Sequence, residues 1–276
     1  MFPNGLVLPL MSEFLDNTID KVTDKQDCEL KAFQRLAARL HRHFPKLPIT
    51  VLLDGLYPNG PVMALCRKYR WEFMIVLQDE SLPNVWEEAN GLRKLHPEQV
   101  HTQTWNGRYQ TFWWVNDIVH EYGPNDRLKQ TIHVVVCEET WEEVNEKGEI
   151  VSKKSRHAWI SSEPLSQKNI HIRCNLMGRK RWGIENDILQ EKKQGYQYEH
   201  IFSHNWNAMK GYHYLMHLAH LLNELAQNSI KLVEQVREVG IRGFVCLLRE
   251  TISGPWLNKE RIKLLGKKRH QLRLIS

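Results

Sequence analysis

Apolar residues recur at helical spacing in separate stretches of the chain. In residues 25–44 they stand three or four positions apart, and charged residues largely occupy the other faces, which predicts an amphipathic helix. Pro45 and Pro48 would end this helix. A similar apolar face predicts a long helix over 206–227, and a further helix is expected over about 229–239. In the first helix, the apolar positions are Leu30, Phe33, Leu36, Ala37, Leu40 and Phe44.

Continuous apolar runs predict two strands that are buried on both faces. Residues 49–53 (ITVLL) form the first run, and Asp54-Gly55 follows it as a sharp turn. Residues 60–69 are expected to form a short helix, and 73–77 (FMIVL) a second buried strand. Strand, helix and strand at this spacing predict a parallel crossover unit, so we expect an α/β core.

Two other regions are expected to contain strands. Residues 6–11 (LVLPLM) predict a short strand at a sheet edge or strand end, because Pro9 cannot donate a ladder hydrogen bond. From about residue 80 to 162, strand-like pieces alternate with polar turns. This alternation predicts an antiparallel β insertion within the α/β core. Its pieces are 109–119, 130–139 and 156–163.

The composition indicates a folded protein. The chain has 276 residues, of which 42% are hydrophobic, including ten Trp. No apolar run approaches the roughly 18–20 residues of a membrane span, and no export signal opens the chain. The five cysteines contain no C-x-x-C pair, so free thiols in a reducing cytosol are expected rather than disulfides or a zinc ribbon. We therefore expect a cytoplasmic protein that does not enter membranes.

The net charge of +6 conceals an asymmetry between the two halves of the chain. Residues 1–150 contain 16 Lys and Arg against 22 Asp and Glu, whereas residues 151–276 contain 22 against 10. The second half therefore carries a net charge of +12. An excess of this size favours a polyanionic partner, of which nucleic acid is the commonest, over a merely solvated basic surface.

Two carboxylates occupy positions suited to chemistry. Asp54 follows a buried strand, where α/β sheets place reactive groups; the alternative is an Asx turn with no chemical role. Glu185 lies in a polar helix candidate over 178–193, with Arg181 four residues before it and Lys192 seven after it. A carboxylate flanked by two cations suits a metal beside phosphates, and the alternative is an ordinary surface salt bridge.

Four stretches together resemble insertion-sequence transposases of the DDE type. The resemblance covers nearly the whole chain, from Asn4 to Lys267, and implies a ribonuclease-H-like mixed sheet with an antiparallel β insertion and C-terminal helices. It also implies two Mg²⁺ (or Mn²⁺) ions bound by three acidic residues. The stretches are 4–17 (NGLVLPLMSEFLDN) with 25–36 (KQDCELKAFQRL), 47–61 (LPITVLLDGLYPNGP), 179–186 (RKRWGIEN), and 193–204 (KQGYQYEHIFSH) with the helix after it.

The resemblance assigns roles to individual residues. Asp54 matches the second metal-binding acid and Glu185 the third. Arg181 and Lys192 match the cations that surround the third acid, and we expect them to hold DNA phosphates. Gly178 stands where the family has Tyr, so that contact to the DNA end is absent from the pattern. Neighbouring basic residues, Arg179 and Lys180, are also expected to bind DNA.

The first acid of the family has no match in this sequence. Asp16, Asp20 and Asp27 match later positions, so we expect the chain to be truncated, with two strands missing from the sheet. The expected function is DNA transposition on double-stranded DNA, with a dimer forming in the complete, nucleoid-associated bacterial enzyme. This chain alone should be weakly active or inactive. The alternatives are a non-catalytic DNA-binding remnant that joins or inhibits an intact transposase, and an unrelated metal nuclease.

Four regions follow from this reading. Residues 1–80 would form the partial core, 81–165 the β insertion, 166–240 the C-terminal helical part of the core, and 241–276 a basic tail. Further candidates are histidines at zinc-binding spacing, for which packing is the favoured role, and tryptophans that either stack on an unpaired base or fill a core. The histidines are His200, His204, His213, His217 and His220, and the tryptophans are Trp113, Trp114 and Trp159.

Overall fold

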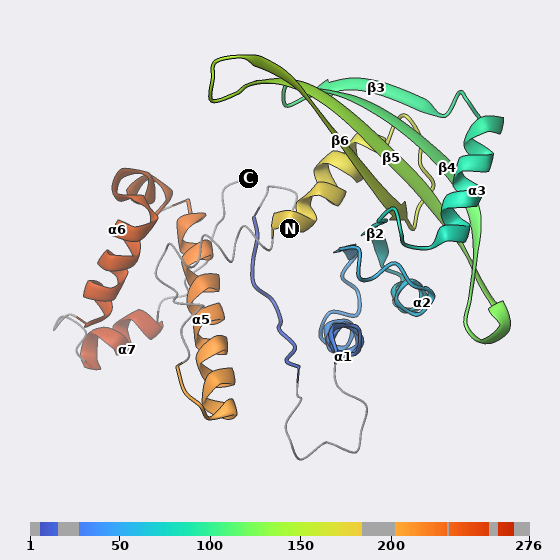
Figure 1. Cartoon of the computed structure of the whole chain (residues 1–276). Coiled ribbons are helices and arrows are strands. Elements are labelled where there is room, and N and C mark those ends of the chain that lie inside the picture. Colours follow the sequence, from blue (N-terminus) through green and yellow to red (C-terminus); the bar gives the residue numbers. More distant parts are fainter. Residues whose placement is uncertain (1–5, 16–27, 184–201, 231, 254–258, 268–276) are drawn as a thin grey trace. The chain divides into compact units, whose positions relative to one another are not determined.

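The structure of the chain, a computed structural model, describes residues 6–15, 28–183, 202–230, 232–253 and 259–267 (Figure 1). It divides into two compact units. One unit spans Ser12–Ile184, and the other combines Met1–Met11 with Glu185–Ser276. The first contains a single mixed sheet with helices, and the described part of the second is mainly helical. The chain is therefore of the mixed α/β class with C-terminal helices.

The sheet has six strands in the order β1-β2-β6-β5-β4-β3. Strands β1 and β2 are parallel and are joined through helix α2, which confirms the predicted crossover unit. All other pairs are antiparallel. The strands are β1 (Thr50–Leu53), β2 (Glu72–Val76), β3 (Val100–Trp105), β4 (Arg108–Tyr122), β5 (Leu128–Val144) and β6 (Ile150–Ser161).

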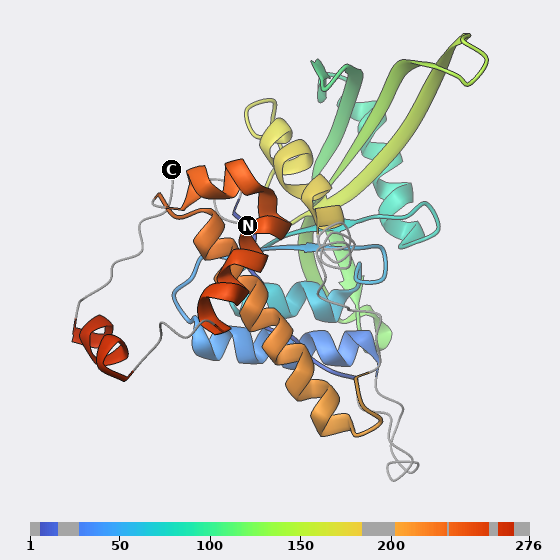
Figure 2. The ribbon, with the colours of Figure 1, turned by 90° about the vertical axis from the view of Figure 1, so that its left-hand side faces the viewer.

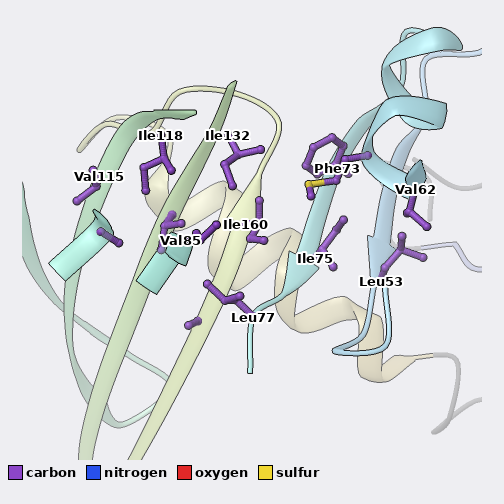
Figure 3. Close-up of a cluster of buried hydrophobic side chains, with 14 of the residues drawn as sticks. Leu53, Val62, Phe73, Ile75, Leu77, Val85, Val115, Ile118, Ile132 and Ile160 are labelled. Carbon is purple, nitrogen blue, oxygen red and sulfur yellow. The ribbon is translucent and has the colours of Figure 1, made fainter. Parts of the chain in front are cut away.

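Three helices pack on one face of this sheet: α1 (Glu29–His43), α2 (Gly60–Lys68) and α3 (Pro83–Leu95). Helices α1 and α2 lie side by side (Figure 2). Side chains from the helices and from five strands form the larger hydrophobic core between the two layers (Figure 3). Its labelled members are Leu53, Val62, Phe73, Ile75, Leu77, Val85, Val115, Ile118, Ile132 and Ile160.

The opposite face of the sheet is covered by the segment that follows β6. This segment contains the π-helical turn η3 (Ile172–Met177) and the 3₁₀ turn η4 (Gly178–Trp182). A second, smaller core forms beneath it, because successive strand residues point to opposite faces. The buried members of this core are Met74, Phe112, Trp114, Val135, Cys137, Trp159, Leu165, Ile170 and Cys174. Another 3₁₀ turn, η2 (Pro124–Asp126), joins β4 to β5.

The structure differs from several sequence expectations. The strands expected as an insertion over 81–165 continue the sheet that begins with β1 and β2, so the sheet crosses the expected boundary at residue 80. Helix α3 and strand β3 were not anticipated. The strand expected over 6–11 is wrong, because the described residues 6–15 form neither helix nor strand. Within residues 6–15, Glu13 forms ion pairs with Arg35 and Arg39 of α1.

The second unit contains helices α5 (Trp206–Gln227), α6 (Val233–Ser253) and α7 (Lys259–Lys267), and α5 packs against α6. Helix α5 has the predicted bounds, and its N-cap Asn205 accepts hydrogen bonds from the amides of residues 207 and 208. The helix expected over about 229–239 continues as α6 to Ser253, with a kink at Gly240, where φ is 72°. No helix within the described ranges is long and apolar enough to cross a membrane.

Candidate functional site

Asp54 directly follows β1 and shapes the turn there. Its Oδ1 accepts a hydrogen bond from the amide of Leu56 at 2.9 Å, and its carbonyl oxygen accepts one from the amide of Tyr57 at 3.2 Å. The Asx turn considered from the sequence is therefore present. A carboxylate can hold a turn with one oxygen and bind a ligand with the other, so this bond leaves a chemical role open.

The end of the neighbouring parallel strand meets this turn. A Cβ placed on Gly55 would lie only 2.4 Å from Cδ of Gln78, which follows β2, so the turn and Gln78 are in close contact. The Gln78 carbonyl is fixed in turn by the indole N–H of Trp86, at 2.9 Å. Burial, followed by the charges of Glu29 and Asp54, raises the pKa of Tyr57. Asp54 thus stands where the carboxyl ends of β1 and β2 come together.

The turn η4 lies against both β1 and β2. Its first residue, Gly178, is buried, and an added Cβ would lie 3.0 Å from Nε1 of Trp159 on β6. A tyrosine, the residue that the resemblance expects at this position, would require the Trp159 ring to move. Gly178 therefore allows η4 to approach the sheet closely.

Arg179, expected to bind DNA, is engaged within the protein. Its Nη2 forms an ion pair with Glu139 Oε1, and its Nε donates to Asn175 Oδ1 at 3.0 Å. The guanidinium carbon lies 5.6 Å from the ring centroid of Trp105 and 5.9 Å from that of Trp159. With 18% of its side chain exposed, Arg179 joins η4 to the sheet.

The remaining predicted site residues fall into two groups. Lys180 is exposed, and the guanidinium carbon of Arg181 lies 4.3 Å from the ring centroid of Trp182. Glu185 and Lys192 lie outside the described residues. Among the residues that the structure describes, no three His, Cys, Asp or Glu side chains gather as a metal-binding group.

A buried polar network, which sequence reasoning missed, links η3 and η4 to the sheet. Four polar residues stand directly opposite one another on β3, β4, β5 and β6: Gln103, Gln110, Glu139 and Ser155. Gln110 bonds to Glu139 and Asn175, and Gln103 bonds to Gln110 at 2.8 Å and to His171 at 2.9 Å. Polar residues at inward-facing positions of apolar strands were the signal that could have revealed it.

The centre of this network is an ionised carboxylate. Glu139 is 1% exposed, and burial by itself would raise its pKa. The hydrogen bond from Gln110, the charge of Arg179 and the hydrogen bond from Arg108 nevertheless lower the pKa of Glu139 below its ordinary value. Arg108 is itself stacked on Trp141, with its guanidinium carbon 4.0 Å from the ring centroid.

Ser155 and His157 beside Glu139 do not form a nucleophilic triad. The Ser155 hydroxyl donates to Glu139 Oε2 at 3.1 Å and lies 3.2 Å from His157 Nε2. His157 Nε2 is 3.6 Å from the same carboxylate oxygen, so the acid contacts the wrong ring nitrogen for that arrangement. Burial, followed by the charge of Arg179, lowers the pKa of His157. The network therefore has a structural role, since it holds η3 and η4 against the sheet.

The tryptophans considered for base stacking fill the cores instead. Trp113, Trp114 and Trp159 are 1%, 5% and 3% exposed, so their ring faces are closed to a base. Of the candidate histidines, His200 lies outside the described residues. His213 and His217 of α5 are adjacent, with ring centroids 4.0 Å apart.

No protein-family model matches the chain, and no curated protein matches it significantly.

Proposed function

We propose that the chain is the later part of a DDE-type transposase with a ribonuclease-H-like catalytic core. The observation that carries the proposal is the position of Asp54, at the carboxyl end of a strand in a parallel crossover unit. The turn η4 lies against the same two strands and ends at Trp182, three residues before Glu185. The proposal that Asp54 and Glu185 act together rests on the resemblance of their two motifs, because Glu185 lies outside the described residues.

The place of β1 in the sheet also supports the proposal. Strand β1 is the first in the sheet order, and in the described part of the chain only β2 pairs with it. Its residues Thr50, Val51 and Leu52 are half-buried. The outer edge of a strand at the end of a sheet can offer its backbone groups to a further strand. A ribonuclease-H-like sheet would continue past β1, and a strand there would bring the first carboxylate.

The donor set suits hard divalent cations. Asp54 and Glu185 would hold Mg²⁺ or Mn²⁺, ions that prefer carboxylate oxygen, and a further carboxylate is needed to complete the site. When bound, the ions activate an attacking oxygen and stabilise the leaving oxygen of a phosphodiester. Arg181 and Lys192 would hold the phosphates at the element end, and exposed Lys180 would add to this basic surface.

Double-stranded DNA is the proposed partner, both as element end and as target, and a dimer is the proposed assembly of the complete enzyme. The net charge of +12 over residues 151–276 supports a polyanionic ligand. A non-catalytic DNA-binding remnant is the second candidate. It is favoured by one observation, namely that no residue of this sequence matches the family's first acid.

DNA binding tests both candidates. Fluorescence anisotropy of a labelled duplex should show an affinity that falls linearly on a logarithmic salt scale. Replacing Arg181 and Lys192 together by Ala should weaken binding and reduce the salt slope by about 2, since each phosphate contact contributes about 0.9.

The matched control is Lys147→Ala, which removes an exposed cation in the turn between β5 and β6 and should leave the affinity unchanged. The proposal fails if the wild-type chain does not bind duplex DNA at low salt. It also fails if the control variant loses as much affinity as the double variant.

A further inference from the structure

Helix α5 in the second unit carries three histidines on one face. His213, His217 and His220 are separated by four and three residues, the spacing that aligns side chains along one side of a helix. The helix is continuous from Trp206 to Gln227, so its backbone fixes this spacing. The ring centroids of His213 and His217 are 4.0 Å apart, and their planes are inclined by 42°. The two imidazoles are thus already adjacent.

We propose that His213 and His217 chelate Zn²⁺ or another borderline divalent transition-metal ion. Imidazole nitrogen is a preferred ligand of these ions, whereas Mg²⁺ prefers oxygen. Zinc–nitrogen bonds are about 2.0–2.1 Å long, so two nitrogens on one tetrahedral ion lie about 3.3 Å apart. Adjacent rings reach this separation by rotating about χ2, a torsion that is broad for histidine.

The surroundings of the pair suit an open metal site. Both rings are half-buried, so an ion can reach them from solvent. His220 lies one turn further along α5, and its Nε2 is 3.5 Å from Glu224 Oε1. A carboxylate that orients an imidazole in this way is the usual support of a metal-binding histidine. His220 is therefore the residue placed to add a third ligand by side-chain rotation, and water fills the remaining positions.

The site differs from the proposed carboxylate site in chemistry. Its donors are imidazole nitrogens of α5, whereas Asp54 and Glu185 offer carboxylate oxygens. Across the described residues, no three donors are gathered in advance. The proposal therefore rests on the His213–His217 pair and not on a closed structural zinc site.

Isothermal titration calorimetry of the full chain with ZnCl₂ tests the inference. Wild type should bind Zn²⁺ at this site, and excess Mg²⁺ should not compete. His213→Asn and His217→Asn should each weaken the affinity about tenfold or more, because each removes one of two ligands. Zn²⁺ should also raise the thermal unfolding midpoint of wild type more than that of either variant.

The matched control is His96→Asn, which removes an exposed histidine beside Glu98 in the other unit and should bind Zn²⁺ like wild type. Circular dichroism checks that each variant remains helical, and His217→Gln serves as a second variant. The inference is overturned if wild type does not bind Zn²⁺, or if the His213 and His217 variants bind it as tightly as wild type.

Discussion

Asp54 combines a turn-forming hydrogen bond with the carboxylate that we propose as a metal ligand. Asn at this position can still accept the hydrogen bond from Leu56, whereas Ala cannot. Asp54→Asn should therefore change the free energy of unfolding by less than about 0.5 kcal/mol, and Asp54→Ala should lower it by about 1 kcal/mol. Urea denaturation of both variants measures the difference. Equal losses in the two variants would show that charge, and not the turn, matters for stability.

Glu139 is the residue on which the buried network depends. In Glu139→Gln, Arg108 and Arg179 keep their charges but lose the carboxylate, which should lower the free energy of unfolding by about 3 kcal/mol. The control is Glu138→Gln, an exposed neighbour on the same strand, which should cost less than about 0.5 kcal/mol. Denaturant unfolding would contradict this assignment if the two variants were equally stable.

The same residue gives a pH dependence. The pKa of Glu139 is lowered from 4.5, so the folded state holds the ionised form more strongly than the unfolded state does. The contribution of Glu139 to the free energy of unfolding is fully present above about pH 4.5. It is lost as the pH falls through the lower pKa that Glu139 has in the folded state. The stability difference between wild type and Glu139→Gln should therefore shrink below this pH. A difference that stays constant down to pH 3 would rule out a lowered pKa for Glu139.

At the scale of elements, helix α2 has a well-defined beginning. The Asn59 side chain accepts a hydrogen bond from the amide of Val62 at 3.0 Å, and Pro61 occupies the first turn. Asn59→Ala should lower the free energy of unfolding by about 1 kcal/mol, while Asn59→Asp should retain most of the stability. Urea midpoints compare the two. If Asp proved as harmful as Ala, this cap would not be what stabilises the start of α2.

The segment after β6 contains helix types that the sequence did not predict. A polar helix was expected over 178–193; its described residues are helical, with a 3₁₀ turn over Gly178–Trp182 that follows a π-helical turn, and residues 184–193 lie outside the described part. Side chains here bond to the sheet as well as along the segment itself, where Arg179 donates to Asn175 four residues earlier. Arg173 bonds to Ser161 at 3.0 Å and to Glu72 at 2.8 Å, and Arg179 pairs with Glu139. Local periodicity carries no information about such long-range partners, so it could not predict this geometry.

At the scale of the whole molecule, we expect the chain to bind DNA without cleaving it. We expect the chain alone to make no Asp54-dependent nicks in supercoiled plasmid with Mg²⁺ or Mn²⁺, because two carboxylates cannot supply the three ligands that the family uses. Agarose gels of wild type and Asp54→Asn, prepared identically, measure this and control for contaminating nucleases. Nicking by wild type that disappears in Asp54→Asn would contradict the expected inactivity.

The sequence by itself determined the positions of those elements that can be recognised from neighbouring residues. Apolar spacing located α1 and α5, and two apolar runs with a short helix between them located the parallel pair β1 and β2. It also singled out Asp54, because a buried strand followed by Asp-Gly implies a turn. Such inferences succeed because each depends on residues that are near in sequence.

Only the tertiary structure decided how distant residues share an environment. It joined β3–β6 to β1 and β2 in one sheet, buried three tryptophans considered for DNA, and paired Arg179 with Glu139 across 40 residues of sequence. Cross-strand register and the packing of η4 on the sheet determine these contacts. Both depend on which strands become neighbours, a choice made by the burial of the whole core and not by any one segment.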